Sequence, residues 1–387
     1  MGLFRLRIAG IFLTITGILV ACNIYTLIPL YSAIGEEMSI PANKVSLGSM
    51  FFTLFYAFGL LIFGPISDRF GRKRIIIGGL FFSALTTILV SMATTPMELF
   101  FYRGLQGFTL ASFAPVTFLY VFELFNGKER TMWLALINTG FLTAGILGQL
   151  AASFLLNIGT WTWVFIAFAC LYGSFHLLNF LILPKTATFT RIIRPKEIIK
   201  DMGTVITNRE MAALYLIVFS ILFSFVAFYE AWGYLGGENM MLFRGIGLGG
   251  ALLSIFTGTF IEKFGAQKTL FVGIVLGWGS IFTTLFLQSQ LFIGVVSMFF
   301  VASIALLIPT IIHLIGVKSG KFRGKALSLY SFILLIGASF GSFVASLFSY
   351  TIVLIILLAF FTLDFLLSLR IGGESKMFET KQSLSRF

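Results

Sequence analysis

Residues 64–74 read Gly-Pro-Ile-Ser-Asp-Arg-Phe-Gly-Arg-Lys-Arg, a short charged stretch between two long apolar runs. The stretch holds four cations, one carboxylate and two glycines. A weaker copy, Gly-Thr-Phe-Ile-Glu-Lys-Phe-Gly-Ala-Gln-Lys, occupies residues 258–268, which lie 194 residues later in a chain of 387. Because half of the chain separates the copies, the pattern predicts two similar halves, each with one charged hairpin on the same side of a membrane.

The composition excludes a water-soluble fold. Hydrophobic residues make up 58% of the chain and charged residues only 11%, against about 25% charged in soluble domains. Within lipid, only helices and closed barrels satisfy every backbone polar group. The apolar runs are of the order of 20 residues, which is the length that a transmembrane helix needs. The sequence therefore predicts an all-α integral membrane protein.

Twelve apolar runs are expected to span the membrane, as two pseudo-symmetric bundles of six helices. Their ranges are 8–32, 46–66, 75–94, 97–122, 131–156, 161–184, 211–234, 243–262, 268–287, 291–316, 325–349 and 350–370. The expected domains are an N-terminal bundle, a cytoplasmic linker, a C-terminal bundle and a cytoplasmic tail, at 1–184, 185–210, 211–370 and 371–387.

The distribution of cations predicts the orientation. With the N-terminus inside, the inner segments hold 24 of the 27 lysines and arginines and the outer loops hold two. By the positive-inside rule, both termini are then cytoplasmic. The same asymmetry accounts for the net charge of +12 without a nucleic-acid partner. With neither an outer-membrane nor an organelle signal in the sequence, we expect a multi-pass protein of the bacterial cytoplasmic membrane.

Each residue type in the stretch at 64–74 has a physical use. Gly64 allows a close helix crossing and Gly71 allows a tight turn. Asp68 can accept hydrogen bonds from a neighbouring helix N-terminus. Arg69 and Arg72, with the two cations that follow, hold the turn at the anionic inner leaflet. A plain topology anchor would need the cations alone, so the fixed aspartate favours a gate.

The weaker copy predicts a second gate in the other half, made of Gly258, Glu262 and Gly265. Ala266 stands where the first copy has its arginine, so the two gates are expected to be unequal.

Two motifs resemble those of a known family. Gly64-x-x-x-Asp68-Arg69-x-Gly71-Arg72-Lys73 resembles the loop 2–3 motif of the major facilitator superfamily, and Arg103-Gly104-Leu105-Gln106-Gly107 is similar to its fourth-helix motif. The resemblance covers nearly the whole chain and is nearest to bacterial drug:proton antiporters. It implies that Asp68, Arg72 and Glu123 form a cytoplasmic charge cluster that locks the outward-open state. This chain departs from the fifth-helix motif of the antiporters, because Gln149 stands in the place of its proline.

Ionisable residues inside a span are expensive, and each is a functional candidate. Arg103 can bind an anionic substrate group, pair with a proton-carrying acid or serve a structural role. Gln106, Asn23 and Tyr25 are further substrate or coupling candidates, and by resemblance the spans that hold Asn23 and Arg103 line the cavity.

Two acids complete the candidates. Glu230 lies among aromatic residues, where a charged carboxyl is costly, so it is the candidate for proton coupling. The alternative is that its helix ends early and Glu230 faces outer water. Asp364 lies near the inner end of the last span, where an acid more often serves a gate or an interface.

These patterns predict a proton-coupled secondary transporter that exports a small amphiphilic compound or metabolite by alternating access. The alternatives are a proton symporter that imports a sugar or organic acid, an exporter of a zwitterionic metallophore and a membrane-embedded sensor. No catalytic set or metal-ligand cluster is evident, so we expect no enzyme and no cofactor besides the proton gradient. The expected partners are protons, membrane lipids and a small-molecule substrate, and the protein is expected to be a monomer.

Overall fold

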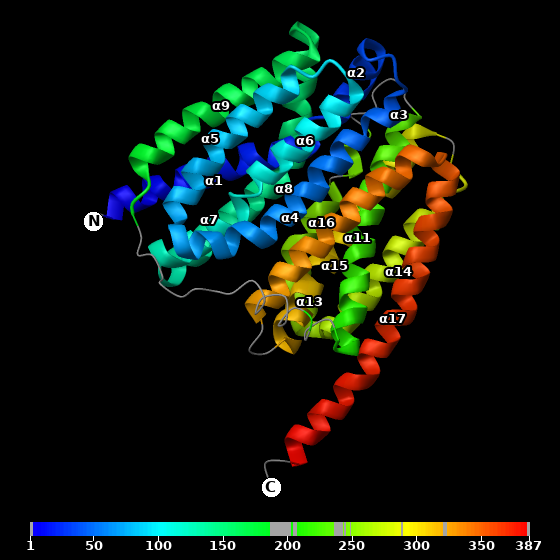
Figure 1. Cartoon of the computed structure of the whole chain (residues 1–387). Helices are drawn as coiled ribbons and strands as arrows, with labels where there is room; N and C mark the ends of the chain where they lie inside the picture. The colour runs from blue at the N-terminus through cyan, green and yellow to red at the C-terminus, as the bar shows by residue number, and fades with distance from the viewer. Residues whose placement is uncertain are drawn as a thin grey trace. The chain divides into compact units, whose positions relative to one another are not determined.

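The computed structural model describes residues 3–185, 203, 207–235, 243, 245–247, 249–287, 289–319 and 323–384. Every regular element within these ranges is an α-helix or a 3-10 helix (Figure 1). Among the described residues, nine helices are long and apolar enough to cross a membrane. The all-α membrane fold is therefore confirmed, and the count of twelve spans stays a prediction.

The chain divides into two compact units, Met1–Ile193 and Arg194–Phe387. The division falls within the expected linker at 185–210. Most of that linker, 186–202 and 204–206, lies outside the described residues, so its structure stays a prediction.

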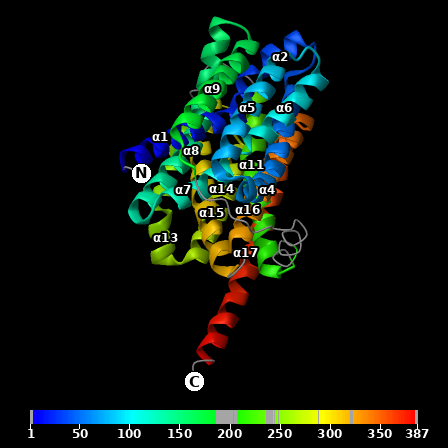
Figure 2. The same cartoon turned by 60° about the vertical axis from the view of Figure 1, so that its left-hand side comes forward.

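The first unit is built from paired helices. Helix α1 packs along α8, α4 along α6, and α5 along α9, and the last of these pairs is clear in Figure 2. The elements of the unit are α1 (Leu3–Tyr25), η1 (Ile28–Leu30), α2 (Tyr31–Glu37), α3 (Ala42–Val45), α4 (Leu47–Phe70), α5 (Arg72–Ser91), α6 (Pro96–Leu110), α7 (Ala114–Leu124), α8 (Gly127–Ile158) and α9 (Trp161–Ile182).

Proline divides two of the expected spans. The run 97–122 forms α6 and α7 instead of one helix, and Pro115 lies in the first turn of α7. Proline has no N–H to donate and its ring clashes with the carbonyl four residues earlier, so the preceding helix ends. Pro29 likewise follows the end of α1, and the rest of the run 8–32 becomes η1 and the start of α2.

The second unit centres on α11, which packs against α16 and α17. The elements are α11 (Arg209–Tyr234), η2 (Gly249–Phe256), α13 (Thr257–Phe264), α14 (Ala266–Thr284), α15 (Gln290–Lys318), α16 (Arg323–Leu347) and α17 (Tyr350–Leu384). Helix α17 continues well past 370, where we expected a tail (Figure 1). The added residues include Glu, Lys, Met, Gln and Leu, which are good helix formers.

Glycines allow one close helix pair in each unit. A Cβ on Gly148 of α8 would lie 2.9 Å from Cα of Cys22 on α1, and one on Gly341 of α16 would clash with the Phe223 carbonyl oxygen on α11. Neither position has room for a side chain. Helices in lipid approach through such small residues, so these glycines set the helix spacing within each unit.

Candidate functional site

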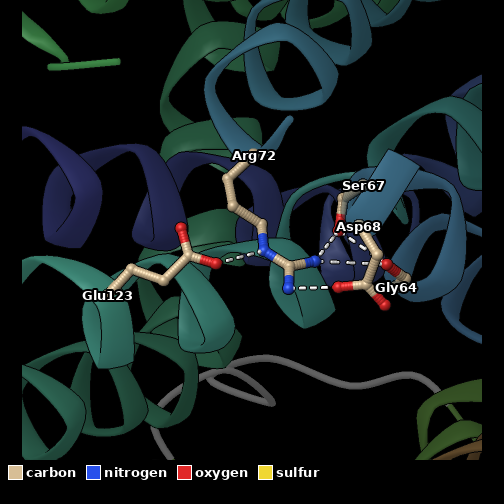
Figure 3. A network of polar contacts seen from close by, with 5 residues as sticks. All are labelled: Gly64, Ser67, Asp68, Arg72 and Glu123. Atoms are coloured by element: carbon tan, nitrogen blue, oxygen red, sulfur yellow. Dashed lines mark hydrogen bonds and ion pairs between the residues drawn. The ribbon is translucent and has the colours of Figure 1, made fainter. Parts of the chain in front are cut away.

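Arg72 joins three helices of the first unit through its guanidinium (Figure 3). Its Nε donates to Glu123 Oε1 of α7 at 3.0 Å, and its Nη2 forms an ion pair with Asp68 of α4. Its Nη1 donates to the Gly64 carbonyl at 3.3 Å and to the Ser67 hydroxyl. The structure thus places Asp68, Arg72 and Glu123 in one network, which we name the Arg72 network.

Local backbone geometry brings these groups together. Gly71 ends α4 with φ 91° and ψ 138°, and its N–H donates to the Ser67 carbonyl at 2.9 Å. Only glycine adopts that conformation without strain. Arg72 then becomes the first residue of α5 and folds back on the last turns of α4, with 5% of its surface exposed. Arginine suits the site because its planar group presents several donors at fixed angles.

Two residues of the same motif differ from expectation. A Cβ on Gly64 would meet only Pro115 Cβ, at 4.0 Å, so Gly64 makes no close helix crossing and contributes its carbonyl instead. Arg69 is exposed and lies over the ring of Phe70, outside the Arg72 network. Ser67 was not anticipated, and nothing in its sequence position distinguishes it from an ordinary helical serine.

The residues beside the Arg72 network hold the end of α9. Lys73 donates to the carbonyls of Phe180 at 2.7 Å and Leu183 at 2.5 Å. Tyr120 of α7 donates to the carbonyl of Pro184. These bonds satisfy carbonyls that have no partner within the helix. The network is therefore tied to the point where the chain leaves the first unit.

The second copy of the motif keeps the turn without the network. Gly265 has φ 84° and ψ 151°, and it separates α13 from α14 as Gly71 separates α4 from α5. Glu262 is exposed and Ala266 offers no donor. A Cβ on Gly258 would meet nothing within 4 Å. Gly258 and Glu262 of α13 and the turn glycine Gly265 therefore form no charge cluster among the described residues.

Arg103 lies at the centre of a buried polar cluster of the first unit. Its Nη1 donates to Gln106 Oε1 at 2.5 Å, and its Nη2 donates to the Asn23 carbonyl at 3.1 Å. Gln106 also donates to Asn23 Oδ1 at 3.0 Å and to Thr87 at 2.8 Å. Asn23 in turn donates to the Tyr172 hydroxyl at 2.6 Å. Three predicted residues, Arg103, Gln106 and Asn23, thus contact one another.

The guanidinium of Arg103 interacts with the faces of aromatic rings and with amide oxygens. The guanidinium carbon lies 4.2 Å from the centre of the Phe52 ring, a favourable arrangement for a buried cation. Among the described residues, no carboxylate lies within ion-pair distance of Arg103. Tyr25 is not in this cluster, since its ring packs against Gly145. Thr87 and Tyr172 were missed because each reads as an ordinary residue of an apolar run.

Glu230 is enclosed within the second unit. It lies in α11, which continues to Tyr234, and 3% of its surface is exposed. The alternative that its helix ends early is therefore wrong. Oε1 accepts from the Ser342 hydroxyl of α16 at 2.8 Å and Oε2 accepts from the Tyr234 hydroxyl at 3.1 Å. Both of these hydrogen bonds come from hydroxyl groups.

Asp364 is the other buried acid of the second unit. It lies within the candidate span Tyr350–Ile371 of α17, and 1% of its surface is exposed. Its contact is with Ser220 of α11. It therefore lies in the core of its unit and not at an exposed helix end.

The chain is similar to known membrane transporters. A model of the Major Facilitator Superfamily matches residues 13–243. An uncharacterized transporter of Buchnera aphidicola subsp. Schizaphis graminum is 25% identical over 333 residues, which are 83% of this chain and 79% of the relative. The crystal structure of the nucleoside transporter NupG superposes with a TM-score of 0.71 at 13% identity, over 94% of this chain and 99% of that one. The latter likeness concerns the fold alone.

Two further relatives are named for drug resistance. Chloramphenicol resistance protein CraA of Acinetobacter baumannii is 28% identical over 49% of this chain and 46% of its own length. Multidrug resistance protein MdtM of Escherichia coli O157:H7 is 26% identical over 57% of this chain and 53% of its own length. The chain thus matches about half of each. Since the family model covers more than half of the chain, this protein belongs to the major facilitator superfamily.

Proposed function

We propose that this member of the superfamily is a proton-coupled exporter of a small amphiphilic compound, working by alternating access in the cytoplasmic membrane. The family is one of multi-pass membrane transporters, which are not enzymes in general. The names of CraA and MdtM support export of drug-like compounds. Twelve spans in two six-helix bundles, cytoplasmic termini and a monomeric state are part of the proposal.

One observation carries the proton coupling. Glu230 is a carboxyl buried among Phe228, Tyr229 and Trp232, with neutral hydroxyls of Ser342 and Tyr234 on its oxygens. Burial penalises a charged carboxylate. Such a group can take up and release protons.

The Arg72 network supplies the conformational lock in this proposal. Arg72 ties α4, α5 and α7 together while it bridges Asp68 and Glu123. When the transporter switches, the network opens and the hydrogen bonds of Arg72 are exchanged for water. A proton on Glu230 changes the relative stability of the two states, because each state solvates that carboxyl differently.

Everted membrane vesicles test the proposal. Respiration acidifies the vesicle lumen, and a pH-sensitive dye reports protons that leave when chloramphenicol or a cationic dye is added. We expect substrate-dependent proton efflux with the wild type and at least about tenfold less with Glu230→Gln, which corresponds to about 1.4 kcal/mol. Tyr234→Phe is the matched control, since it removes one hydrogen bond and leaves the carboxyl.

The same proton-flux assay, run in right-side-out vesicles as well, decides between export and import. An importer would show substrate-dependent proton flux only in right-side-out vesicles. If Glu230→Gln transports with the proton dependence of the wild type, Glu230 is not the proton carrier.

A second candidate function is export of a carboxylate-bearing metabolite, such as a zwitterionic metallophore. Its support is Arg103, a fully buried cation with no carboxylate within ion-pair distance among the described residues. A substrate carboxylate would provide the missing counter-charge. Comparing metabolites in the medium of cells with and without the protein distinguishes this candidate from drug export.

A further inference from the structure

Asp364 has an incomplete set of hydrogen bonds. Its Oδ2 contacts the Ser220 hydroxyl, and its Oδ1 is buried without a hydrogen-bond partner among the described residues. A carboxylate accepts hydrogen bonds at both oxygens, so an ionised Asp364 would leave a charged oxygen unsatisfied in the core. A neutral carboxyl would leave only a carbonyl oxygen there, at much lower cost.

Ser220 supplies an independent argument. Its Oγ lies 3.1 Å from the Ile217 carbonyl as well as within hydrogen-bond distance of Asp364. A hydroxyl has a single proton to donate. If Asp364 is ionised, both neighbours of Ser220 are acceptors and only one of them is satisfied. If Asp364 carries a proton on Oδ2, Asp364 donates to Ser220 and Ser220 donates to Ile217, so both contacts become hydrogen bonds.

The surroundings of Asp364 offer no counter-charge among the described residues. Within the part of the chain that the structure describes, no lysine, arginine or histidine lies within ion-pair distance of Asp364. Helix α17 packs on α11, α14 and α16. Their ionisable residues with described side chains, besides Glu230, are Arg209, Glu210, Tyr215, Tyr229 and Tyr234 on α11, Lys268 on α14, Tyr330 on α16, and Tyr350 and Arg370 on α17.

The charges near the helix ends are engaged or exposed. Glu210 is paired with Lys318, while Arg209, Lys268 and Arg370 are exposed. Aromatic rings also pack between α17 and α11, where the ring centres of Phe360 and Phe223 lie 4.6 Å apart. Among the described residues, the one contact that would favour the ionised form is a hydrogen bond donated by Ser220.

We propose that Asp364 is a proton-binding site of the second unit, in which the bound proton completes the hydrogen-bond chain from Asp364 through Ser220 to the Ile217 carbonyl. The site is separate from Glu230, which lies ten residues beyond Ser220 on α11 and accepts from Ser342 and Tyr234. Proton binding links α17 to α11, the helix that also carries Glu230. The proposal that this second proton takes part in transport rests on the proposed function. The proposal that Asp364 carries a proton does not.

Infrared spectroscopy of the full-length protein in liposomes at neutral pH tests the site directly. A protonated carboxyl has a C=O stretching band that carboxylates lack. We expect Asp364→Asn to remove one such band, and Glu230→Gln to leave that band in place. Ser220→Ala should keep the band and shift it to higher frequency, because the carboxyl loses its hydrogen-bond acceptor.

Two results would overturn the assignment. One is a spectrum of Asp364→Asn that retains every protonated-carboxyl band of the wild type. The other is a Ser220→Ala spectrum in which no such band moves, and this variant decides the matter if Asp364→Asn does not fold. The spectrum needs no substrate, so a failed vesicle assay with an intact Asp364 band would refute proton-coupled export and leave the proton site standing.

Discussion

The turns at Gly71 and Gly265 share a backbone and differ in their side chains. Both glycines have positive φ, 91° and 84°, and each N–H donates to a carbonyl four residues earlier at 2.9 Å. After the first turn Arg72 binds two carboxylates, whereas after the second Ala266 binds none. Glycine therefore forms the turn, and the arginine that follows it forms the network.

The difference separates two roles that the motif combines. A helical hairpin needs only the glycine and flanking cations, and the second unit keeps both. A lock needs a donor that reaches acids on different helices, and Arg72 alone provides it among the described residues of the two turns. In the proposed function, switching therefore depends on the first turn, whereas both turns serve the topology.

Replacing Arg72 should have the largest effect. Arg72→Ala leaves Asp68 and Glu123 without their shared partner in a partly buried site. Removing one partner of a buried pair costs about 3–5 kcal/mol. We expect substrate-dependent proton efflux in everted vesicles to fall by at least about a hundredfold, because 1.4 kcal/mol corresponds to about tenfold.

Arg72→Lys is the matched control for that loss. Lysine keeps the charge but offers no planar fork of donors, so it can pair with one acid at a time. Efflux should be intermediate between the wild type and Arg72→Ala. Full activity with lysine would mean that charge alone suffices and that the bridging geometry is unimportant.

Because the two turns share a backbone conformation, replacing either glycine should lower the free energy of unfolding by a similar amount. Gly71→Ala and Gly265→Ala both force a side chain into a conformation that only glycine adopts easily, at about 1–3 kcal/mol each. Thermal unfolding of the purified variants should therefore show similar losses of stability. A loss confined to Gly71→Ala would show that the second turn relaxes and that the two backbones are not equivalent.

Neutralising the acid of each turn should have unequal effects on transport. Asp68→Asn removes the charge that pairs with Arg72, and we expect efflux to fall about tenfold, or about 1.4 kcal/mol. Glu262→Gln alters an exposed side chain, so its effect should be within about twofold, as for most surface changes. Equal defects in the two variants would contradict the asymmetry between the turns.

Much of the Arg72 network could be predicted, because its parts have sequence signals. Gly71, Asp68 and Arg72 are close in the chain and have fixed spacing, while Glu123 was placed by family resemblance. Ser67 and the role of the Gly64 carbonyl could not be predicted, because backbone groups and single serines carry no distinguishing pattern. The missing crossing at Gly64 depends on the distance between helices, which sequence does not give.

The contacts within the buried clusters were harder to predict, because they also depend on how the helices pack. Arg103, Gln106 and Asn23 stand out as polar residues within apolar runs, but which of them meet depends on helix rotation. Tyr25 lies only two residues from Asn23 and points elsewhere, toward Gly145. Proline divides the expected fourth span into α6 and α7. This error in the helix bounds moved no candidate residue out of the first unit.

Ala266→Arg is the finest test of the comparison, because it adds to the second turn the residue that distinguishes the first. The new side chain would find Glu262 four residues earlier, in the register of Asp68 and Arg72. It would find no counterpart of Glu123, since Val317 stands 194 residues after Glu123 and the adjacent Lys318 is already paired with Glu210. A single exposed pair contributes only about 0.2–1 kcal/mol.

We therefore expect the rate of proton efflux with Ala266→Arg to stay within about twofold of the wild type, because a lock requires acids on two helices. The free energy of unfolding should change by no more than about 1 kcal/mol. The measurements are thermal unfolding and the everted-vesicle assay. A strong slowing of efflux would mean that the arginine alone creates a lock and that a second acid is unnecessary. Ala266→Arg combined with Val317→Glu sharpens the point, since efflux should slow in the double variant only if the added acid binds the arginine in preference to Lys318.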